Sequence, residues 1–317
     1  MTSALCLGLA LIGAPPAPGP ARMASALPAL KQELDGIARK FGGRLGYYLK
    51  DLTDGRTIGF RHDERFPTAS TIKTALMLEA VRQVDAGKRK WTDKIAIPPK
   101  SERTENMQSM WSYYFQDGLA PDLDGWCNLM IGVSDNTATR VLGSNLGNEA
   151  VNASLTNLGL PNTKFLAYAP ASDTVTRRLN RQFGMGMTTP LEMNRLLELI
   201  ATGKAASPAG CDRMLRILKR QYWDDAIGSS VPPQVAIANK TGAINRSRSD
   251  AAIVYGPRPY ILTIYTDNQT DQRWAADNEA DLTLARIGNL VWNRMNPTMP
   301  YARPAHSERF APTGGGI

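Results

Sequence analysis

Strand patterns at both ends of the chain, separated by a long helical stretch, constrain the fold more than any other feature. Residues 44–52 alternate apolar and polar side chains, and an Asp54-Gly55 turn signal leads into a second strand at 57–61. Three further strand patterns lie near the opposite end, at residues 234–240, 250–255 and 260–266. Because each strand must pair to bury its apolar face, we expect all five to share one antiparallel sheet.

Helical periodicity fills most of the rest. Apolar residues recur at helical spacing over 27–41, before the first strands, and over 284–295, after the last ones. The clearest helices between the strands are 70–86, 123–143, 147–158 and 189–203. Residues 161–188 show no sustained periodicity, and so long a loop inside a compact domain is usually functional. The predicted class is α/β (α+β): a five-stranded antiparallel sheet flanked by the terminal helices, beside an all-helical subdomain.

The two ends of the chain have sequence patterns that are not typical of a folded domain. Ala4–Ala14 is an apolar run too short to span a bilayer, and Ala24 and Ala26 form an A-x-A cleavage pattern, although no Lys or Arg precedes the run. We therefore expect export to the periplasm or the medium, with no membrane span. The predicted organisation is a signal peptide at 1–26, a domain at 27–296 (α/β part 27–66 and 206–296, helical part 67–205) and a disordered tail at 297–317.

Composition narrows the chemistry. His62 and His306 are the only two histidines among 317 residues, so a multi-histidine metal centre and a histidine general base are both disfavoured. We expect no metal and no organic cofactor. The net charge of +8 is dispersed, which disfavours a nucleic-acid partner. Outside the leader, which holds Cys6, the cysteines are Cys127 and Cys211. Cys127 fits a helix's apolar face as a buried free thiol, while pairing of the two stays open.

Ser70 and Lys73 are the first pair suited to catalysis. They lie three residues apart at the start of a helix, so the hydroxyl and the amine share one face. The helix N-terminus stabilises an anion at Ser70 and disfavours the protonated form of Lys73. Lys73 can then be the general base that a histidine-poor chain lacks, although the S-x-x-K pattern alone is weak.

Two later segments are equally weak alone. Ser134–Asn136 follows an apolar run and places a hydroxyl and an amide at the edge of the core; the alternative is an ordinary helix cap. Lys240–Gly242 ends a predicted strand, where a cation and a hydroxyl can bind a carboxylate beside an approachable backbone. The alternative there is a plain strand exit.

Together and in this order, S-x-x-K at Ser70, S-D-N at Ser134 and K-T-G at Lys240 are the signature set of class A β-lactamases and penicillin-binding proteins. The sequence resembles the class A serine β-lactamase family over roughly residues 27–295. The flanking segments Arg61–Phe66 and Thr188–Pro190 are similar to the family as well, and the strand order is that of the family's sheet.

The resemblance implies a role for each motif residue. Ser70 would be the nucleophile, Lys73 would take or relay its proton, and Ser134 would protonate the leaving nitrogen. Asn136 would hold Lys73 and meet the substrate's side-chain amide. The substrate would also be held by residues of the third motif and its neighbours, with an oxyanion hole formed by the backbone N–H groups of Ser70 and Ala243. These substrate-binding residues are Thr241, Gly242, Ala243 and, as a second carboxylate contact or else a surface arginine, Arg248. Lys240 would be a catalytic residue that binds the carboxylate with Thr241 and also supports the proton relay.

The sequence departs from the family at the residue that activates the deacylating water. The family's loop carries E-x-x-L-N, whereas this chain has Thr176 in the Glu position before Leu179-Asn180. Asp173 is the only carboxylate between Asn162 and Leu191, so it is the candidate replacement, against an ordinary loop aspartate.

Two smaller departures concern stability and the cleft walls. Met77 stands where many relatives have a cysteine to pair with the one that Cys127 matches, so that disulfide is absent. A dense aromatic group sits between the first two motifs and could either wall the substrate cleft or simply pack. Its members are Trp111, Tyr113, Tyr114 and Phe115.

The resemblance thus implies a serine β-lactamase-type hydrolase that acylates Ser70 with a β-lactam and hydrolyses the acyl-enzyme. One alternative is a penicillin-binding D-Ala-D-Ala carboxypeptidase or esterase with slow deacylation, acting on a peptidoglycan stem peptide. The other is a non-catalytic envelope binding protein, which the intact motif residues disfavour. We expect a monomer.

Overall fold

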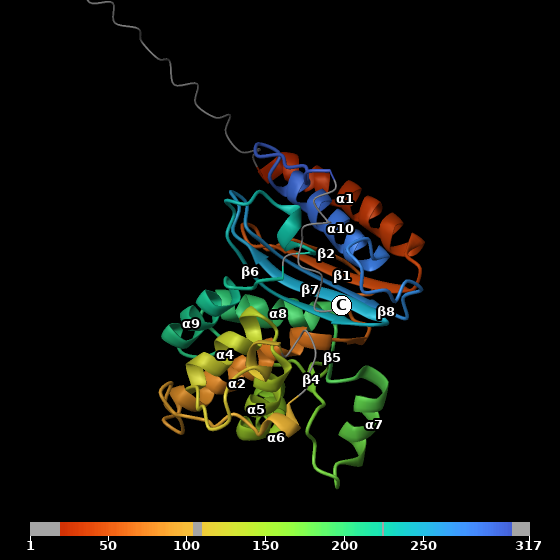
Figure 1. Ribbon diagram of the computed structural model, residues 1–317. Helices are drawn as coiled ribbons and strands as arrows, with labels where there is room; N and C mark the ends of the chain where they lie inside the picture. The colour runs from red at the N-terminus through yellow and green to blue at the C-terminus, as the bar shows by residue number, and fades with distance from the viewer. Residues whose placement is uncertain (1–19, 104–109, 224, 306–317) are drawn as a thin grey trace, which may run out of the picture.

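The computed structural model describes residues 20–103, 110–223 and 225–305, and a five-stranded antiparallel sheet runs through its centre (Figure 1). Across the sheet the strands are β2 (Thr57–Phe60), β1 (Arg44–Asp51), β8 (Tyr260–Asp267), β7 (Ser247–Val254) and β6 (Ile237–Ile244). The first two strands of the chain thus pair with the last three through β1 and β8, with Tyr47 opposite Ile264. The predicted single sheet built from both ends of the chain is confirmed.

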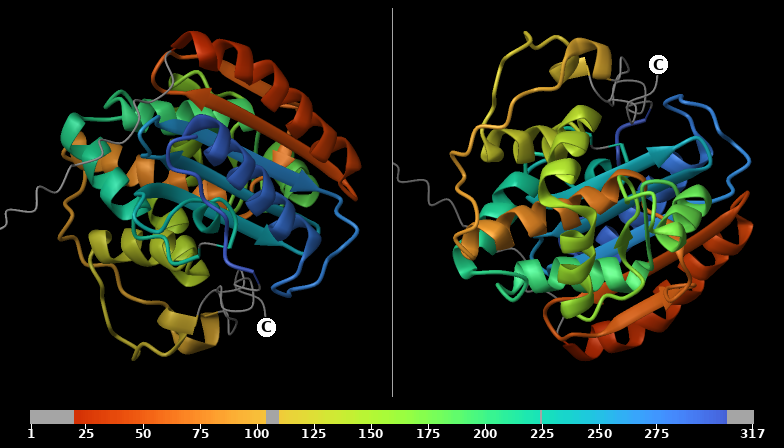
Figure 2. Two further views of the ribbon diagram at one scale, coloured as in Figure 1. Left: turned by 90° about the horizontal axis from the view of Figure 1, so that it is seen from above. Right: turned by 90° about the horizontal axis from the view of Figure 1, so that it is seen from below.

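Helices cover both faces of this sheet, which explains why every residue of β7 and β8 is buried. The terminal helices α1 (Pro20–Lys40) and α10 (Glu279–Met295) lie side by side on one face, as Figure 2 shows. Helix α8 (Pro190–Ala201) packs on the other face against β1 and β8. The sheet is therefore held between two apolar layers.

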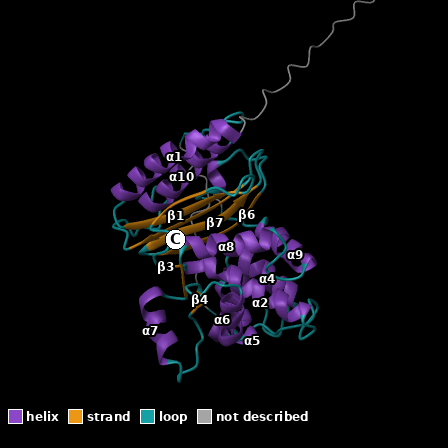
Figure 3. Ribbon diagram, turned by 180° about the vertical axis from the view of Figure 1, so that it is seen from behind, coloured by secondary structure: helices purple, strands orange, loops and turns teal. Residues whose placement is uncertain are grey.

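The helical subdomain lies beyond α8 (Figure 3). Its central helix, α2 (Lys73–Asp85), is buried from Lys73 to Val81 because four other helices pack around it. The helices that surround α2 are α4 (Leu123–Gly132), α5 (Asn136–Leu146), α6 (Asn148–Asn157) and α9 (Pro208–Leu218). A small sheet of β3 (Phe66–Pro67), β5 (Gly186–Thr188) and β4 (Lys164–Phe165) links this subdomain to the rest. Short turns complete the elements: η1 (Ala69–Ile72), η2 (Lys100–Glu102), α3 (Met110–Tyr113) and η4 (Gly228–Ser230).

Three boundary predictions were wrong. The expected helix 123–143 is two helices, because Ser134 has a φ of 60°, which an α-helix cannot accommodate. The segment 161–188 is not structureless but contains α7 (Thr174–Phe183), where only Val175, Leu179 and Phe183 are apolar and recur every four residues. The K-T-G motif does not end a strand; it lies in the middle of β6.

The chain ends also differ from expectation. Helix α1 begins at Pro20 and runs through the predicted cleavage site, and residues 1–19 of the predicted signal peptide lie outside the described residues. The predicted disordered tail was wrong for its first part, because that part is bonded to α10. The Trp292 indole donates to the Met299 carbonyl oxygen at 2.8 Å, and the Tyr301 N–H donates to Asn293 Oδ1 at 2.8 Å. The rest of the tail, with His306, lies outside the described residues.

The cysteines are as predicted for a protein without the family's bridge. Cys127 and Cys211 are both buried and both free, and Met77 is buried in the core. Burial raises the pKa of the Cys127 thiol, so it behaves as an apolar side chain. Among the helices of the described ranges, we find none with the length and apolar character needed to span a bilayer.

Candidate active site

Ser70 lies in the tight turn η1, immediately before α2, at the junction of the sheet and the helical subdomain. Its side chain is nearly buried, and the preceding residue, Ala69, has a φ of 44°. A non-glycine residue in this left-handed region is strained, and such strain concentrates at functional sites. The backbone thus presents Ser70 at the start of a helix, as its spacing from Lys73 predicted.

The Lys73 amine is fully buried and bonded to the S-D-N motif. Nζ lies 2.7 Å from the Ser134 carbonyl oxygen, 2.9 Å from Asn136 Oδ1 and 3.1 Å from Ser134 Oγ. Burial, reinforced by the charge of Lys240, holds the Lys73 pKa well below its ordinary value. Nζ donates to all three acceptors, and the low pKa favours loss of its extra proton to give the neutral amine. Lys73 is therefore arranged to accept a proton.

The S-D-N motif contains both a helix cap and side chains that contact Lys73, at different residues. Asp135 is the helix cap: its carboxylate accepts from the Ala138 N–H at 2.8 Å at the start of α5. It also accepts from the Ser112 hydroxyl at 2.8 Å, which ties the neighbouring loop to the motif. With Asp135 fixed in this way, the side chains of Ser134 and Asn136 are left to contact Lys73.

Lys240 lies on β6 and is also fully buried. Burial lowers its pKa to about 7, against the opposing effect of the nearby Asp250 and Asp225 carboxylates. Burial likewise raises the pKa of Asp250 to about 6, although Asp250 accepts hydrogen bonds from Asn239 Nδ2 (3.1 Å) and the Ile227 N–H (3.0 Å). Both groups therefore change charge near neutral pH.

Gln221 is a site residue that the sequence gave no reason to single out. The hydrogen-bond network orients its amide: the nitrogen faces the Ile131 and Gly132 carbonyls, and the oxygen lies 3.1 Å from both Lys240 Nζ and the Thr241 N–H. Gln221 lies in the loop after α9 and belongs to none of the three motifs, so only its contacts in the folded protein identify it.

Gly242 allows β6 to press against the Ser70 turn. A Cβ at this position would lie 2.5 Å from the Thr68 carbonyl oxygen and 2.9 Å from the Ser70 nitrogen, closer than real contacts allow. Only glycine therefore fits, and the next residue, Ala243, is brought beside Ser70. Ser70 and Ala243 line the same two hollows.

The two hollows flank the Ser70 hydroxyl. The first lies between the S-D-N bend, β6 and α10 and has about 370 Å³ of empty space, which includes the solvent at its mouth. Its wall combines motif residues with acidic and aromatic side chains: Ser70, Ser134, Trp223, Asp225, Ala226, Thr241, Gly242, Ala243, Arg248, Ser249 and Asp281. The second has a cavity volume of about 220 Å³ and is open to solvent. It is lined by Ala69, Ser70, Asn136, Thr139, Tyr168, Phe183, Gly184, Met185, Ala243 and Ile244. Every predicted site residue except Lys73, Lys240 and Asp173 thus lines a hollow, and the two lysines are buried beneath.

Asp173 lies apart from both hollows. It caps α7 by accepting from the Thr176 N–H at 2.9 Å, and its hydrogen bonds to Thr176 lower its pKa. Among the described residues that line the second hollow there is no carboxylate. The 161–188 segment contributes the exposed Tyr168 to this wall. The aromatic group Tyr113–Phe115 lines neither hollow. The side chain of Trp111 lies outside the described residues.

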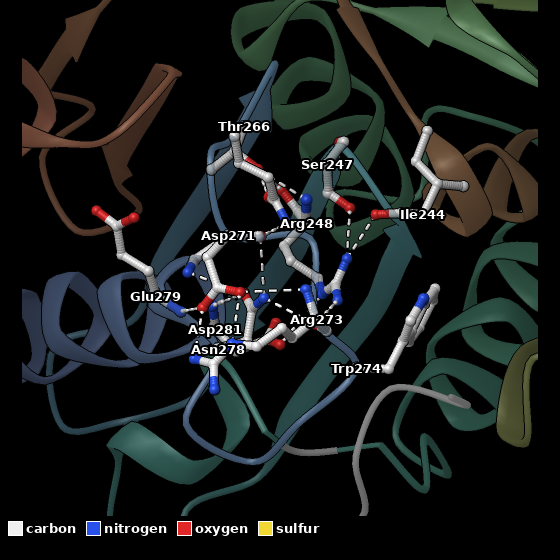
Figure 4. A network of polar contacts seen from close by, with 12 residues as sticks. Ile244, Ser247, Arg248, Thr266, Asp271, Arg273, Trp274, Asn278, Glu279 and Asp281 are labelled. Atoms are coloured by element: carbon white, nitrogen blue, oxygen red, sulfur yellow. Dashed lines mark hydrogen bonds and ion pairs between the residues drawn. The ribbon is translucent and has the colours of Figure 1, made fainter. Parts of the chain in front are cut away.

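Arg248 is not a surface arginine. Its side chain is 2% exposed, lies on β7 opposite Ala243 and lines the first hollow together with Asp281 (Figure 4). Within the described ranges, no three His, Cys, Asp or Glu side chains gather closely enough to hold a metal ion.

A serine that follows a strained residue, a buried low-pKa lysine and a second serine bonded to that lysine define a serine acyl-transfer site on an α+β scaffold. Residues 29–295 match the family described as "Beta-lactamase enzyme family" (Beta-lactamase2). The chain belongs to this family, as the motifs indicated.

Individual relatives agree with this assignment. The chain is 27% identical to a β-lactamase of Amycolatopsis lactamdurans over 82% of this chain and 84% of that one. It is 28% identical to β-lactamase AER-1 of Aeromonas hydrophila over 80% and 82% of the two chains. Among solved structures, a β-lactamase from Sphaerobacter thermophilus is similar with a TM-score of 0.71, 25% identity and coverage of 87% and 99%. The fold is shared with the L158E mutant of PBP-A in an acyl-enzyme complex with penicillin G, with a TM-score of 0.73, 24% identity and coverage of 86% and 97%.

Proposed function

We propose that this protein is a class A-like serine β-lactamase, which opens a β-lactam by acylating Ser70 and then hydrolyses the ester. The observation that carries the proposal is the Lys73 amine, fully buried and bonded to Ser134 and Asn136 beside Ser70. This arrangement gives a serine nucleophile a base and a proton exit in one cluster.

In acylation, neutral Lys73 takes the proton of the Ser70 hydroxyl as Oγ attacks the lactam carbonyl. The backbone N–H groups of Ser70 and Ala243 stabilise the oxyanion, a contribution of about 3 kcal/mol for a single donor. When the C–N bond breaks, Ser134 gives its proton to the leaving nitrogen and regains one from Lys73. Lys73 is then neutral again, so the relay is ready for the second half of the reaction.

The substrate carboxylate is assigned to the first hollow. Thr241 lines this hollow, and Lys240 supplies a positive charge from below at pH values under about 7. Asn136 lines the second hollow and is assigned to the substrate's side-chain amide.

Asp173 is our candidate for the base that activates the deacylating water. Asp173 is supported by being the only carboxylate between Asn162 and Leu191, while its position as an α7 cap is that of a structural residue. If Asp173 is the base, Asp173→Asn stalls turnover after acylation and leaves the acylation rate nearly unchanged. Full hydrolysis by Asp173→Asn would remove it from the mechanism.

One observation favours a second candidate, a penicillin-binding D-Ala-D-Ala carboxypeptidase or esterase that deacylates slowly. No carboxylate lines the second hollow, so no residue of that described wall is suited to activate water by accepting its proton. Carboxypeptidase activity on a stem peptide, together with a penicillin adduct that lasts for hours, would select this candidate.

The test of the proposal is incubation with a chromogenic cephalosporin, followed by mass spectrometry. We expect colour change with many turnovers and a covalent adduct on Ser70; neither turnover nor adduct would reject it. We propose further that the protein is exported, to the periplasm or the medium, and acts as a monomer on small molecules. Fractionation of cells and size-exclusion chromatography test these points.

A further inference from the structure

Arg248 connects three separate segments at the end of the first hollow (Figure 4). Nε donates to Asp281 Oδ2 on α10 at 3.1 Å, and Nη2 donates to the Arg273 carbonyl oxygen, in the loop before α10, at 3.0 Å. Nη1 donates to the carbonyl oxygens of Ile244 (2.5 Å) and Ser247 (3.2 Å), which flank the turn between β6 and β7. The arginine thus fastens that turn to the loop and to α10.

The guanidinium is nearly fully occupied by these contacts. Four of its five N–H groups have the protein partners just described, so a substrate carboxylate could not receive two parallel hydrogen bonds unless some of them broke. The indole of Trp274 covers one face of the guanidinium at 4.4 Å and donates from Nε1 to Asn245 Oδ1, in the same turn, at 2.7 Å. Asp281 already supplies the negative charge that a buried arginine requires.

The turn that Arg248 fastens follows directly after the part of β6 that lies against Ser70. Gly242 lies against the Ser70 turn, and Ala243 is paired with Arg248 across the two strands. Since β6 is an edge strand, its other side has no neighbouring strand of the sheet to fix it. A displacement of about 1 Å at a catalytic group can reduce a rate by about a hundredfold.

We propose that Arg248 and Asp281 are a positioning pair that holds the end of β6 against Ser70, and that the substrate carboxylate is bound by Thr241 and Lys240 instead. The inference rests on the proposed function, because it assigns the Ala243 N–H to the oxyanion hole. It deepens that function by separating the residue that aligns the site from those that bind the substrate's charge.

The test compares benzylpenicillin with its methyl ester in the double variant Arg248→Met/Asp281→Asn, which leaves no unpaired buried charge. We expect the acylation rate to fall by roughly tenfold on both substrates, with the acid-to-ester ratio of kcat/KM unchanged within about twofold. A loss confined to the free acid, or no loss on either substrate, would overturn the proposal. Arg273→Met is the matched control, because its exposed guanidinium bonds only to Asp271 and Asp277 in the same loop, and we expect it to behave as the unaltered protein.

Arg248→Lys separates position from charge. Lysine keeps the positive charge but lacks the planar fork that reaches three segments, so we expect the same loss on both substrates. Recovery of the acid alone by Arg248→Lys would instead show that Arg248 binds the carboxylate.

A second readout does not depend on any substrate. Hydrogen exchange at Gly242–Ile244 should increase at least several-fold in the double variant, while β8 stays protected. Unchanged exchange at Gly242–Ile244 would contradict the positioning role even if the protein proved not to be a β-lactamase. If the unaltered protein forms no Ser70 adduct, the proposed function is rejected. The hydrogen-exchange result still tests the positioning role separately.

Discussion

The two hollows beside Ser70 have walls of different kinds. The first, under β6, is backed by buried residues with several specific contacts each: Lys240 lies under Gln221, and Arg248 joins three segments. The second, against the 161–188 segment, is lined mostly by small and apolar residues, together with the uncharged polar side chains of Asn136 and Thr139 and the exposed Tyr168. The charged wall suits acylation and carboxylate binding, whereas the described residues of the other wall include no carboxylate of the kind that the family uses to activate the deacylating water. The comparison suggests a site better prepared for its first half-reaction than for its second.

The largest effect is expected at Lys73, which is buried beneath the two hollows. Lys73→Met should reduce acylation by roughly a hundred- to ten-thousandfold, because it removes the base and the relay to Ser134. Stopped-flow acylation with a chromogenic cephalosporin measures this, with Lys219→Met on the surface as the control. A Lys73→Met rate within tenfold of the unaltered protein would show that another base acts.

Gly242→Ala should follow, with an acylation rate reduced about a hundredfold at most, because the added Cβ would lie 2.5 Å from the Thr68 carbonyl oxygen. The control is Gly36→Ala in α1, where a Cβ meets nothing within 4 Å. There we expect unchanged acylation and a gain of about 0.5–1 kcal/mol in unfolding free energy from helix propensity. Equal acylation by both variants would mean that β6 is not held as closely as described.

A faster deacylation rate is expected when a carboxylate is added beside the second hollow. Thr176→Glu restores the family's carboxylate in its register on α7, and general-base catalysis by a positioned carboxylate supports a rise of at least tenfold in deacylation. The decay of a preformed penicillin adduct measures this, with acylation expected to change little. No acceleration would show that this face of α7 does not reach the acyl ester.

The smallest effect concerns pH on the charged wall. The Lys240 pKa of about 7 means that the ammonium is present below that pH and is lost above it, so KM for an anionic penicillin should rise several-fold from pH 6 to 8.5. Its methyl ester should show no such rise. Asp250→Asn removes a carboxylate that stabilises the Lys240 ammonium, so the midpoint should move to lower pH. A KM independent of pH for both substrates would remove Lys240 from carboxylate binding.

The sequence predicts the sheet well because strand alternation and turn residues are local signals that survive in the fold. It predicts Ser70, Lys73 and Ser134 as a cluster because their roles are tied to motif spacing. Gln221 and the Arg248–Asp281 pair could not be found in this way, since their contacts join segments far apart in the chain. The bend at Ser134 was missed because serine, unlike glycine, gives no sequence signal for a positive φ.

The most direct test of the account is the mass of the protein during reaction with a simple penicillin. We expect an adduct on Ser70 within seconds, followed by its decay while many equivalents of opened penicillin accumulate. A protein that never gains the adduct, or that keeps one equivalent bound for hours without turnover, would contradict the assignment as a β-lactamase.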